Sequence, residues 1–404
     1  MGGDCLNIGC VPSKAVISAA NAFRKIKEVS QFGISLPAGQ ATIDFGFVMK
    51  RMRKIRAEIS HHDSVARYAH DFCEHVYGQG EFAPASEGKI ITVTGDDGST
   101  RQLRYKKAMI ATGASAFVPP VLRDVPHLTN ANFFNLTVLP PRMVVVGSGP
   151  IGLELAQSMS VFGCEVTCLE MGPQILMRED PDAAKVLREQ LEKDGVRIAC
   201  HSSVVSIEII NKEVECSLFN GPFPLYNVTI HNTSTGEDTV VQCEAILNAT
   251  GRVPNVFNLG LENVHVSFDN RVGVHINPHF RTANKDIYSC GDCSTAYKFT
   301  HAADFQARLA IRNMYLGDTN CLSDLLIPWC TYTYPEIAHV GKYEAELQRD
   351  GVKFESFVRQ LRPVDRCLCD GVEAGFVKLT VLEGSDQIIG ATICAEHAGK
   401  LMVA

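Results

Sequence analysis

Residues 143–154 read MVVVGSGPIGLE, an apolar run followed by three glycines in the spacing G-x-G-x-x-G. The apolar run predicts a strand, and the residues after it predict a helix over 150–162. Gly147 allows a tight turn, Gly149 lets a pyrophosphate approach backbone N–H groups, and Gly152 lets the helix pack closely on the strand. A glycine pattern alone is weak evidence, but one that joins a strand to a helix is typical of a dinucleotide-binding βαβ unit.

A carboxylate follows at the end of the next predicted strand, 165–170, where Glu170 stands. A carboxylate at this place accepts hydrogen bonds from a ribose diol and repels a 2′-phosphate. No arginine follows before Arg178, so the sequence favours NADH over NADPH. The alternation of helix and strand then continues, with a helix predicted over 180–194 and strands predicted over 196–200, 204–210, 213–219, 226–231 and 240–249.

Two cysteines lie near the start of the chain, in the segment CLNIGCVPSK from Cys5 to Lys14. Pro12 suits the first turn of a helix predicted over 10–29, so Cys10 should lie at a helix N-terminus. The positive end of the helix dipole stabilises a thiolate there, which predicts a redox-active pair. The alternatives are two structural cysteines or half of a zinc site, but a zinc site needs two more ligands and none lies near in the sequence.

The other segments supply further α/β elements. A helix predicted over 44–70 has basic residues between the members of its apolar face, which are Phe45, Val48, Met49, Met52, Ile55 and Ile59. Further predictions are a strand over 76–82, a hairpin over 89–94 and 101–111, a linker over 120–141, a helix over 301–315 and a mixed α/β segment from 327 onwards.

A strand predicted over 286–290 ends in Gly291-Asp292, which places a carboxylate at the carboxyl edge of a sheet. There the turn can meet a ribityl hydroxyl of a flavin, or a flavin phosphate through backbone N–H groups. Cys290 and Cys293 flank this turn in a C-x-x-C spacing, which could make a second redox pair. The Gly-Asp turn explains the segment without one.

Composition limits the classes of function. The 404 residues suggest two to three domains, and the net charge of -7 argues against a nucleic-acid partner held by a basic surface. No apolar run reaches the roughly 18 residues that cross a bilayer. Most of the 15 cysteines are scattered through apolar segments, which is typical of buried thiols in a reducing intracellular compartment.

Taken together, these residues resemble the class I pyridine nucleotide–disulfide oxidoreductases, a family that includes dihydrolipoamide dehydrogenase, glutathione reductase and mercuric reductase. The resemblance covers essentially the whole chain, and the mercuric-reductase-like branch is the most similar. The matching segments are GGDCLNIGCVPSK (2–14), ATGA (111–114), VVVGSGPIGLE (144–154), ATGRVPN (249–255), DIYSCGDC (286–293), FTHAADFQA (299–307) and PWCTYTYPEIAHVG (328–341).

The resemblance implies roles for individual residues. Cys10 would be the thiol against the flavin, Cys5 would be the thiol that meets substrate, and Lys14 and Glu154 would pair near flavin N5. The FAD site would comprise Lys14, Gly80, Thr112, Gly113, Asp292, Lys298, Phe299, Thr300 and His301. The NAD(P) site would comprise Gly147, Ser148, Gly149, Pro150, Ile151, Gly152, Leu153, Glu154, Glu170 and Gly251. Hydride would pass from NAD(P)H to FAD, and electrons would pass on to the Cys5–Cys10 disulfide.

The implied fold class is α/β, with two Rossmann-like three-layer dinucleotide-binding domains and an incomplete α+β interface domain. The predicted limits are 1–140 and 256–327 for the FAD-binding domain, 141–255 for the NAD(P)-binding domain and 328–404 for the interface domain. The resemblance also implies a homodimer and a small-molecule disulfide, dithiol or metal-ion substrate.

Two departures from the family pattern are expected to matter. The family begins with its own FAD-binding G-x-G-x-x-G unit and ends with a His-Pro-x-x-x-Glu segment, and neither is present in residues 1–404. We therefore expect a chain truncated at both ends, poorly soluble and weak in flavin. The alternative function is a non-catalytic NAD-binding paralogue that no longer holds FAD, and a metal-binding protein is a third, poorer interpretation.

Overall fold

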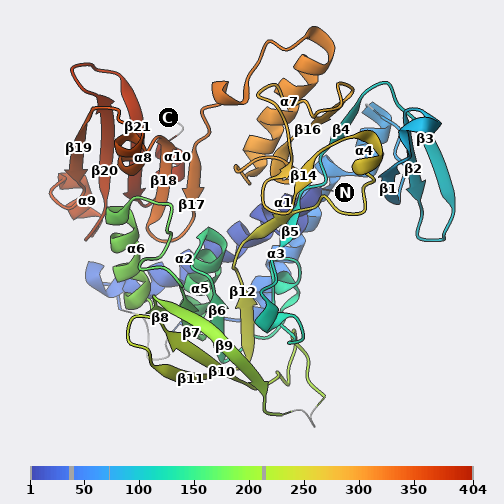
Figure 1. Cartoon of the computed structure of the whole chain (residues 1–404). Helices are drawn as coiled ribbons and strands as arrows, with labels where there is room; N and C mark the ends of the chain where they lie inside the picture. Colours follow the sequence, from blue (N-terminus) through green and yellow to red (C-terminus); the bar gives the residue numbers. More distant parts are fainter. Residues whose placement is uncertain (1, 36–40, 72, 212–214, 403–404) are drawn as a thin grey trace. The chain divides into compact units, whose positions relative to one another are not determined.

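The computed structural model describes residues 2–35, 41–71, 73–211 and 215–402. Contacts divide the chain into two compact units. Unit 1 comprises His62–Phe117 and Arg252–Ile327, and unit 2 comprises Gly2–His61, Val118–Gly251 and Pro328–Ala404. Figure 1 shows the elements in chain order from blue to red. The limits of the predicted domains stay a prediction.

A four-stranded parallel sheet forms the centre of unit 2 and confirms the predicted βαβ unit. Its order is β12 (Ala245–Asn248), β6 (Arg142–Val146), β7 (Glu165–Leu169) and β8 (Val196–Ala199). The helices α5 (Pro150–Phe162) and α6 (Pro181–Lys193) follow β6 and β7 in the chain. Both begin with proline, whose missing N–H costs nothing at that position.

The segment predicted as a linker, 120–141, is instead packed into unit 2. Leu128 forms a parallel bridge with Leu247, and its N–H donates to Ile246 O at 2.8 Å. Four of its apolar side chains are fully buried, namely Leu122, Leu128, Phe133 and Leu136. The proline and asparagine content suggested a linker, but this burial makes the segment part of the core.

Unit 2 also contains a three-stranded antiparallel sheet. Its order is β11 (Asp238–Cys243), β10 (Tyr226–Asn232) and β9 (Ser202–Ile209). The single strand predicted over 240–249 is therefore wrong, because β11 and β12 belong to different sheets. The strand predicted over 213–219 falls partly on 213–214, outside the described residues. Residues 215–219 form no strand, since the Ser217 hydroxyl accepts the N–H groups of Phe219 and Asn220 in a local turn.

Three helices open unit 2, namely α1 (Gly3–Asn7), α2 (Cys10–Glu28) and α3 (Phe45–Ile59). The helix predicted over 44–70 is too long, because a 3-10 turn at Ser60–Asp63 separates α3 from α4 (Val65–Asp71) in unit 1. The Ser60 hydroxyl donates to Ala57 O, and such side-chain bonds to the backbone compete with a continuing helix.

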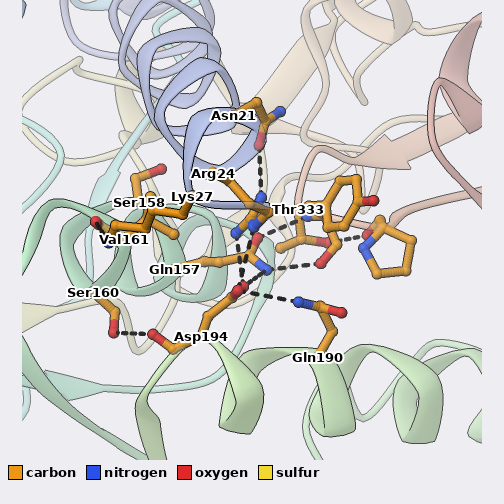
Figure 2. A network of polar contacts seen from close by, with 12 residues as sticks. Asn21, Arg24, Lys27, Gln157, Ser158, Ser160, Val161, Gln190, Asp194 and Thr333 are labelled. Atoms are coloured by element: carbon orange, nitrogen blue, oxygen red, sulfur yellow. Dashed lines mark hydrogen bonds and ion pairs between the residues drawn. The ribbon is translucent and has the colours of Figure 1, made fainter. Parts of the chain in front are cut away.

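A buried ion pair joins several helices of unit 2, as Figure 2 shows. Arg24 on α2 donates to both carboxylate oxygens of Asp194 just after α6, at 3.2 and 2.7 Å. Gln157 on α5 donates to the same carboxylate at 2.7 Å and accepts the N–H of Tyr334. The side chains of Arg24 and Asp194 are 4% and 9% exposed. The network therefore connects α2, α5 and the end of α6 with the C-terminal segment.

The C-terminal segment of unit 2 is a five-stranded antiparallel sheet, as the mixed α/β prediction allows. Its order is β17 (Trp329–Thr331), β18 (Glu336–Gly341), β21 (Ile388–Ala395), β20 (Phe376–Leu382) and β19 (Phe354–Gln360). The short helices with it are α8 (Glu344–Arg349), α9 (Asp365–Cys369) and α10 (Ala398–Leu401).

Unit 1 holds the predicted hairpin as β2 (Ile90–Thr94) and β3 (Thr100–Arg104), with β1 (Gln79–Phe82) on the other side of β2. The strand predicted over 101–111 is in fact two strands. β4 (Ala108–Ile110) leaves the hairpin and pairs in parallel with β16 (Ile287–Ser289). β5 (Ala114–Ala116) pairs with β13 (Arg252–Pro254), β14 (Phe268–Asp269) pairs with β15 (Gly273–Val274), and α7 spans Thr300–Leu316. Within the described ranges, no helix combines the length and the apolar character needed to cross a bilayer.

Candidate functional site

Gly9 lies between the two N-terminal cysteines, at a point where the backbone of α1 comes close to the start of α2. Cys5 is in α1, and Cys10 is the first residue of α2, as the sequence predicts. A Cβ atom on Gly9 would lie 2.8 Å from Asp4 O and 3.3 Å from the Cα of Cys5. Glycine is therefore required here for the backbone of α1 to approach the start of α2. Both cysteines are half-buried.

Several other cysteines are chemically unlike a helix N-terminal thiol. Burial raises the pKa of Cys164, Cys168 and Cys243 to about 12 each, which keeps these thiols protonated and inert. Burial also raises the pKa of Cys290 to about 11, which opposes the interpretation of Cys290 and Cys293 as a second redox pair. Among the residues that the structure describes, no three His, Cys, Asp or Glu side chains lie together as a metal site.

Lys14 and Glu154 meet one helical turn into α2. The Lys14 ammonium lies 2.9 Å from the Oε2 atom of Glu154 on α5. Glu154 is 5% exposed, and its other oxygen accepts the N–H of Tyr332 at 3.0 Å. The structure thus brings together the two residues that the sequence paired, although their role beside a flavin stays a prediction.

Tyr332 belongs to this cluster and was not predicted from the sequence. Its ring centroid lies 4.3 Å from the Lys14 ammonium, a cation–π contact that supports the position of the lysine. Partial burial, together with the nearby Cys330, Glu336, Glu154 and Cys10, raises the pKa of the Tyr332 phenol to about 12. The only sequence signal was its place in the segment 328–341, just after β17.

The glycine-rich loop between β6 and α5 has the geometry that a dinucleotide needs. Gly147 has a φ of +103°, and a Cβ atom there would lie 2.6 Å from Ala249 O. A Cβ atom on Gly152 would lie 2.3 Å from Gly147 O, so the helix can approach the loop only with glycine. By contrast, no heavy atom lies within 4 Å of the place where Gly149 would carry a Cβ. The loop therefore leaves open space at the N-terminus of α5, where a pyrophosphate binds best.

Glu170 stands directly after β7 and is fixed against this loop. Its Oε2 atom accepts the hydroxyl and the N–H of Ser148, and its Oε1 atom accepts the N–H of Gly172 at 2.8 Å. Gly251 has a φ of +130° with no heavy atom within 4 Å of its Cβ position, so it too borders open space. Pro150 and Ile151 are exposed at the start of α5. Leu153 is fully buried, so its side chain packs in the core rather than facing a cofactor.

All of the predicted FAD residues except Lys14 lie in unit 1. The β16 strand leads into Asp292, whose carbonyl accepts the Lys298 ammonium at 2.8 Å and whose carboxylate lies 3.5 Å from Arg252. Asn255 fixes the turn at Thr112 and Gly113: its N–H donates to Gly113 O at 2.9 Å, and its amide donates to Thr112 O at 2.9 Å.

The remaining members of this set are Gly80, Phe299, Thr300 and His301. Gly113 has a φ of +71° and no heavy atom within 4 Å of its Cβ position, which leaves room for a ligand there. The rings of Phe299 and His301 stack with centroids 5.6 Å apart at the start of α7, which begins at Thr300. Gly80 lies in β1 opposite Val93.

The comparisons with known proteins cover the whole chain. The sequence model of the pyridine nucleotide-disulphide oxidoreductases matches residues 1–307, and the model of their dimerisation domain matches residues 327–404. A mercuric reductase of Shigella flexneri is 31% identical over all of this chain and 68% of its own length. A mitochondrial dihydrolipoyl dehydrogenase of Dictyostelium discoideum is 29% identical, with 80% of its length covered. The solved structure of LpdA from Mycobacterium tuberculosis has a TM-score of 0.83 at 26% identity, over 100% of this chain and 84% of that one.

Proposed function

Because the chain belongs to the pyridine nucleotide-disulphide oxidoreductase family, whose members use FAD and NAD(P)H, we propose that Cys5 and Cys10 are its redox-active disulfide. The observation that carries the proposal is the position of Cys10 at the start of α2, one turn before the Lys14–Glu154 ion pair. When bound, FAD accepts a hydride from the nicotinamide and supplies two electrons to this disulfide.

The chain's own residues fit these cofactors. Open space next to Gly149 and Gly251 and the anchored carboxylate of Glu170 would hold NADH, with the pyrophosphate on the N–H groups that begin α5. Thr112, Gly113 and Asp292, with the segment 298–301, would hold FAD. Lys14 would place a positive charge beside the flavin, kept in position by Glu154 and Tyr332.

The cysteines would then exchange thiols with substrate. In the reduced state, the Cys5 thiolate attacks a substrate disulfide, releases one thiol and forms a mixed disulfide. The Cys10 thiolate next attacks Cys5, which releases the second substrate thiol and restores the Cys5–Cys10 bond. The dipole of α2 and the Lys14 ammonium both favour negative charge on Cys10. A dithiol could be oxidised by the reverse path, and a thiophilic metal ion bound by the cysteine thiolates could accept the two electrons in place of a disulfide.

We expect the protein to act as a homodimer, since residues 327–404 match the dimerisation domain of the family. We also expect an FAD-binding domain of residues 1–140 and 256–327, an NAD(P)-binding domain of residues 141–255 and an interface domain of residues 328–404.

The test is the anaerobic visible spectrum of the purified protein supplied with FAD, before and after NADH. We expect a flavin spectrum that gains a long-wavelength charge-transfer band on reduction. Cys10→Ser should abolish the band, whereas Cys5→Ser should keep it without NADH, because Cys10 then has no partner in the disulfide. Flavin that NADH reduces with no such band in the unsubstituted protein would contradict the proposal. Binding of NADH without FAD would instead favour a non-catalytic NAD-binding protein.

A further inference from the structure

The residues that connect β7 to α6 are anchored to the C-terminal sheet of unit 2. The Oε1 atom of Glu179 accepts the indole N–H of Trp329 at 2.8 Å, and its Oε2 atom accepts the hydroxyl of Tyr343. The next residue, Asp180, is 4% exposed and accepts the ammonium of Lys378 at 2.7 Å. Trp329 begins β17 and Lys378 lies in β20, so two strands of one sheet hold the end of this connection.

The same connection reaches the glycine-rich loop through Leu176. Its N–H donates to Ser148 O at 3.1 Å, and its carbonyl accepts the N–H of Glu179 at 2.8 Å. Leu176 is buried and has a φ of +49°, a left-handed conformation that residues with a Cβ atom rarely adopt. Such a conformation persists only where the surrounding contacts hold it. Glu179 supplies such contacts, because it is bonded to Leu176 through its backbone and to the sheet through its side chain.

The carbonyl of Ser148 sets the direction of the next N–H group in the loop. A trans peptide is planar, so the C=O of Ser148 and the N–H of Gly149 point in opposite directions. Because Ser148 O accepts from Leu176, the N–H of Gly149 points away from Leu176. Glu170 holds the other side of Ser148 by accepting its N–H and its hydroxyl. The direction of the Gly149 N–H therefore depends on contacts made outside the loop.

We propose that Glu179 is a positioning residue for the nicotinamide dinucleotide. Glu179 holds Leu176 in place, and Leu176 fixes the direction in which Gly149 donates to the pyrophosphate. This inference rests on the proposed function of the glycine-rich loop as the NADH site. Since Trp329 and Tyr343 lie within residues 327–404, which match the dimerisation domain of the family, the C-terminal sheet supports nucleotide binding in the same chain.

The experiment measures binding without turnover. Isothermal titration calorimetry of the purified protein gives the Kd for NAD⁺ and for ADP-ribose, which carries the same pyrophosphate without nicotinamide. We expect Glu179→Ala to raise both Kd values by the same factor, about fivefold, as for one hydrogen bond that is less well aligned. Glu179→Gln should restore most of the affinity, because its amide oxygen still accepts the indole N–H of Trp329.

Asp194→Ala is the control for a general loss of stability. It removes the buried partner of Arg24 in the same unit and should lower stability in urea while leaving both Kd values unchanged. An unchanged Kd for NAD⁺ in Glu179→Ala, an equal rise in Asp194→Ala, or a rise for NAD⁺ without one for ADP-ribose would overturn the inference. If the unsubstituted protein does not bind NAD⁺, the proposed nucleotide site itself is wrong, and this inference falls with it.

A milder pair of variants decides the question if Glu179→Ala does not fold. Tyr343→Phe removes one hydroxyl that donates to Glu179 and should raise both Kd values about twofold. Tyr226→Phe is its match, because it removes a hydroxyl of the same unit that donates to Pro126 O at 2.6 Å. This second variant should bind both ligands as the unsubstituted protein does, and equal affinities in the two variants would count against the role of Glu179.

Discussion

The ion pair between Lys14 and Glu154 joins two helices: α2, which begins at Cys10, and α5, which begins directly after the glycine-rich loop. The ammonium and the carboxylate are 2.9 Å apart, and only the lysine side chain is partly exposed. The pair therefore links the position of the proposed redox cysteines at the start of α2 to that of the glycine-rich loop before α5.

We expect Glu154→Gln to lower the rate at which NADH reduces the protein about ten- to a hundredfold, because Lys14 loses the charge that orients it. Glutamine can still accept the N–H of Tyr332, so the fold should survive. Stopped-flow measurement of the charge-transfer band after NADH addition checks this. Glu58→Gln, which removes the exposed partner of Lys54, is the control. Unchanged kinetics in Glu154→Gln would show that the pair is only structural.

Glu170 should decide between the two nicotinamide cofactors. Its carboxylate is held by Ser148 and Gly172, and we expect the protein to prefer NADH because this charge repels a 2′-phosphate. Glu170→Gln should reduce the ratio of kcat/KM for NADH over NADPH about tenfold, the size of one charged hydrogen bond. Steady-state rates with each cofactor measure it. Glu165→Gln at the other end of β7 should keep the ratio, and a ratio unchanged in Glu170→Gln would contradict the assignment.

His339 should make unfolding sensitive to acid. The ring is 1% exposed, with Thr392 and Gly341 as hydrogen-bond partners, and burial lowers its pKa to about 4. The unfolded chain, with an ordinary histidine pKa of about 6.5, binds a proton that the folded chain does not. Stability should therefore fall as the pH drops from 7 to 5, by about 2 kcal/mol from this residue.

The measurement is urea unfolding at the two pH values. His339→Gln should remove most of the difference, whereas His397→Gln, with a side chain that is 59% exposed, should not. The same pH dependence in the unsubstituted protein and in His339→Gln would assign it to other groups.

Asp194→Ala should destabilise unit 2 strongly, because it leaves the charge of Arg24 buried without its counter-ion. We expect the free energy of unfolding to fall by about 3–5 kcal/mol, measured in urea. Lys193→Gln, which removes the neighbouring exposed pair with Glu373, should change it by less than about 1 kcal/mol. Similar losses in the two variants would mean that burial of the Arg24–Asp194 pair is unimportant.

The sequence correctly predicted the features that depend on neighbouring residues in the chain. Helix α5 spans the predicted residues 150–162, because a strand, three glycines and a proline specify its start and Gly163 specifies its end. Cys10 stands at the helix N-terminus for the same kind of reason. The features that the sequence did not predict depend on contacts between residues that are far apart in the chain. Tyr332 joins the site through its backbone N–H and its ring, neither of which has a sequence pattern, and the segment 120–141 is buried because it meets β12.

The Arg24 network has a practical meaning for protein engineering. α2 has 19 residues, so Cys10 at its start and Arg24 near its end are separated by about 20 Å along the helix axis. Side chains near the Cys10 end, such as Val11 and Ser18, can then be exchanged while Arg24, Gln157 and Asp194 keep the helix in place. A library that varies these positions and leaves the anchor untouched is the natural starting point for redesigning the surroundings of the cysteines.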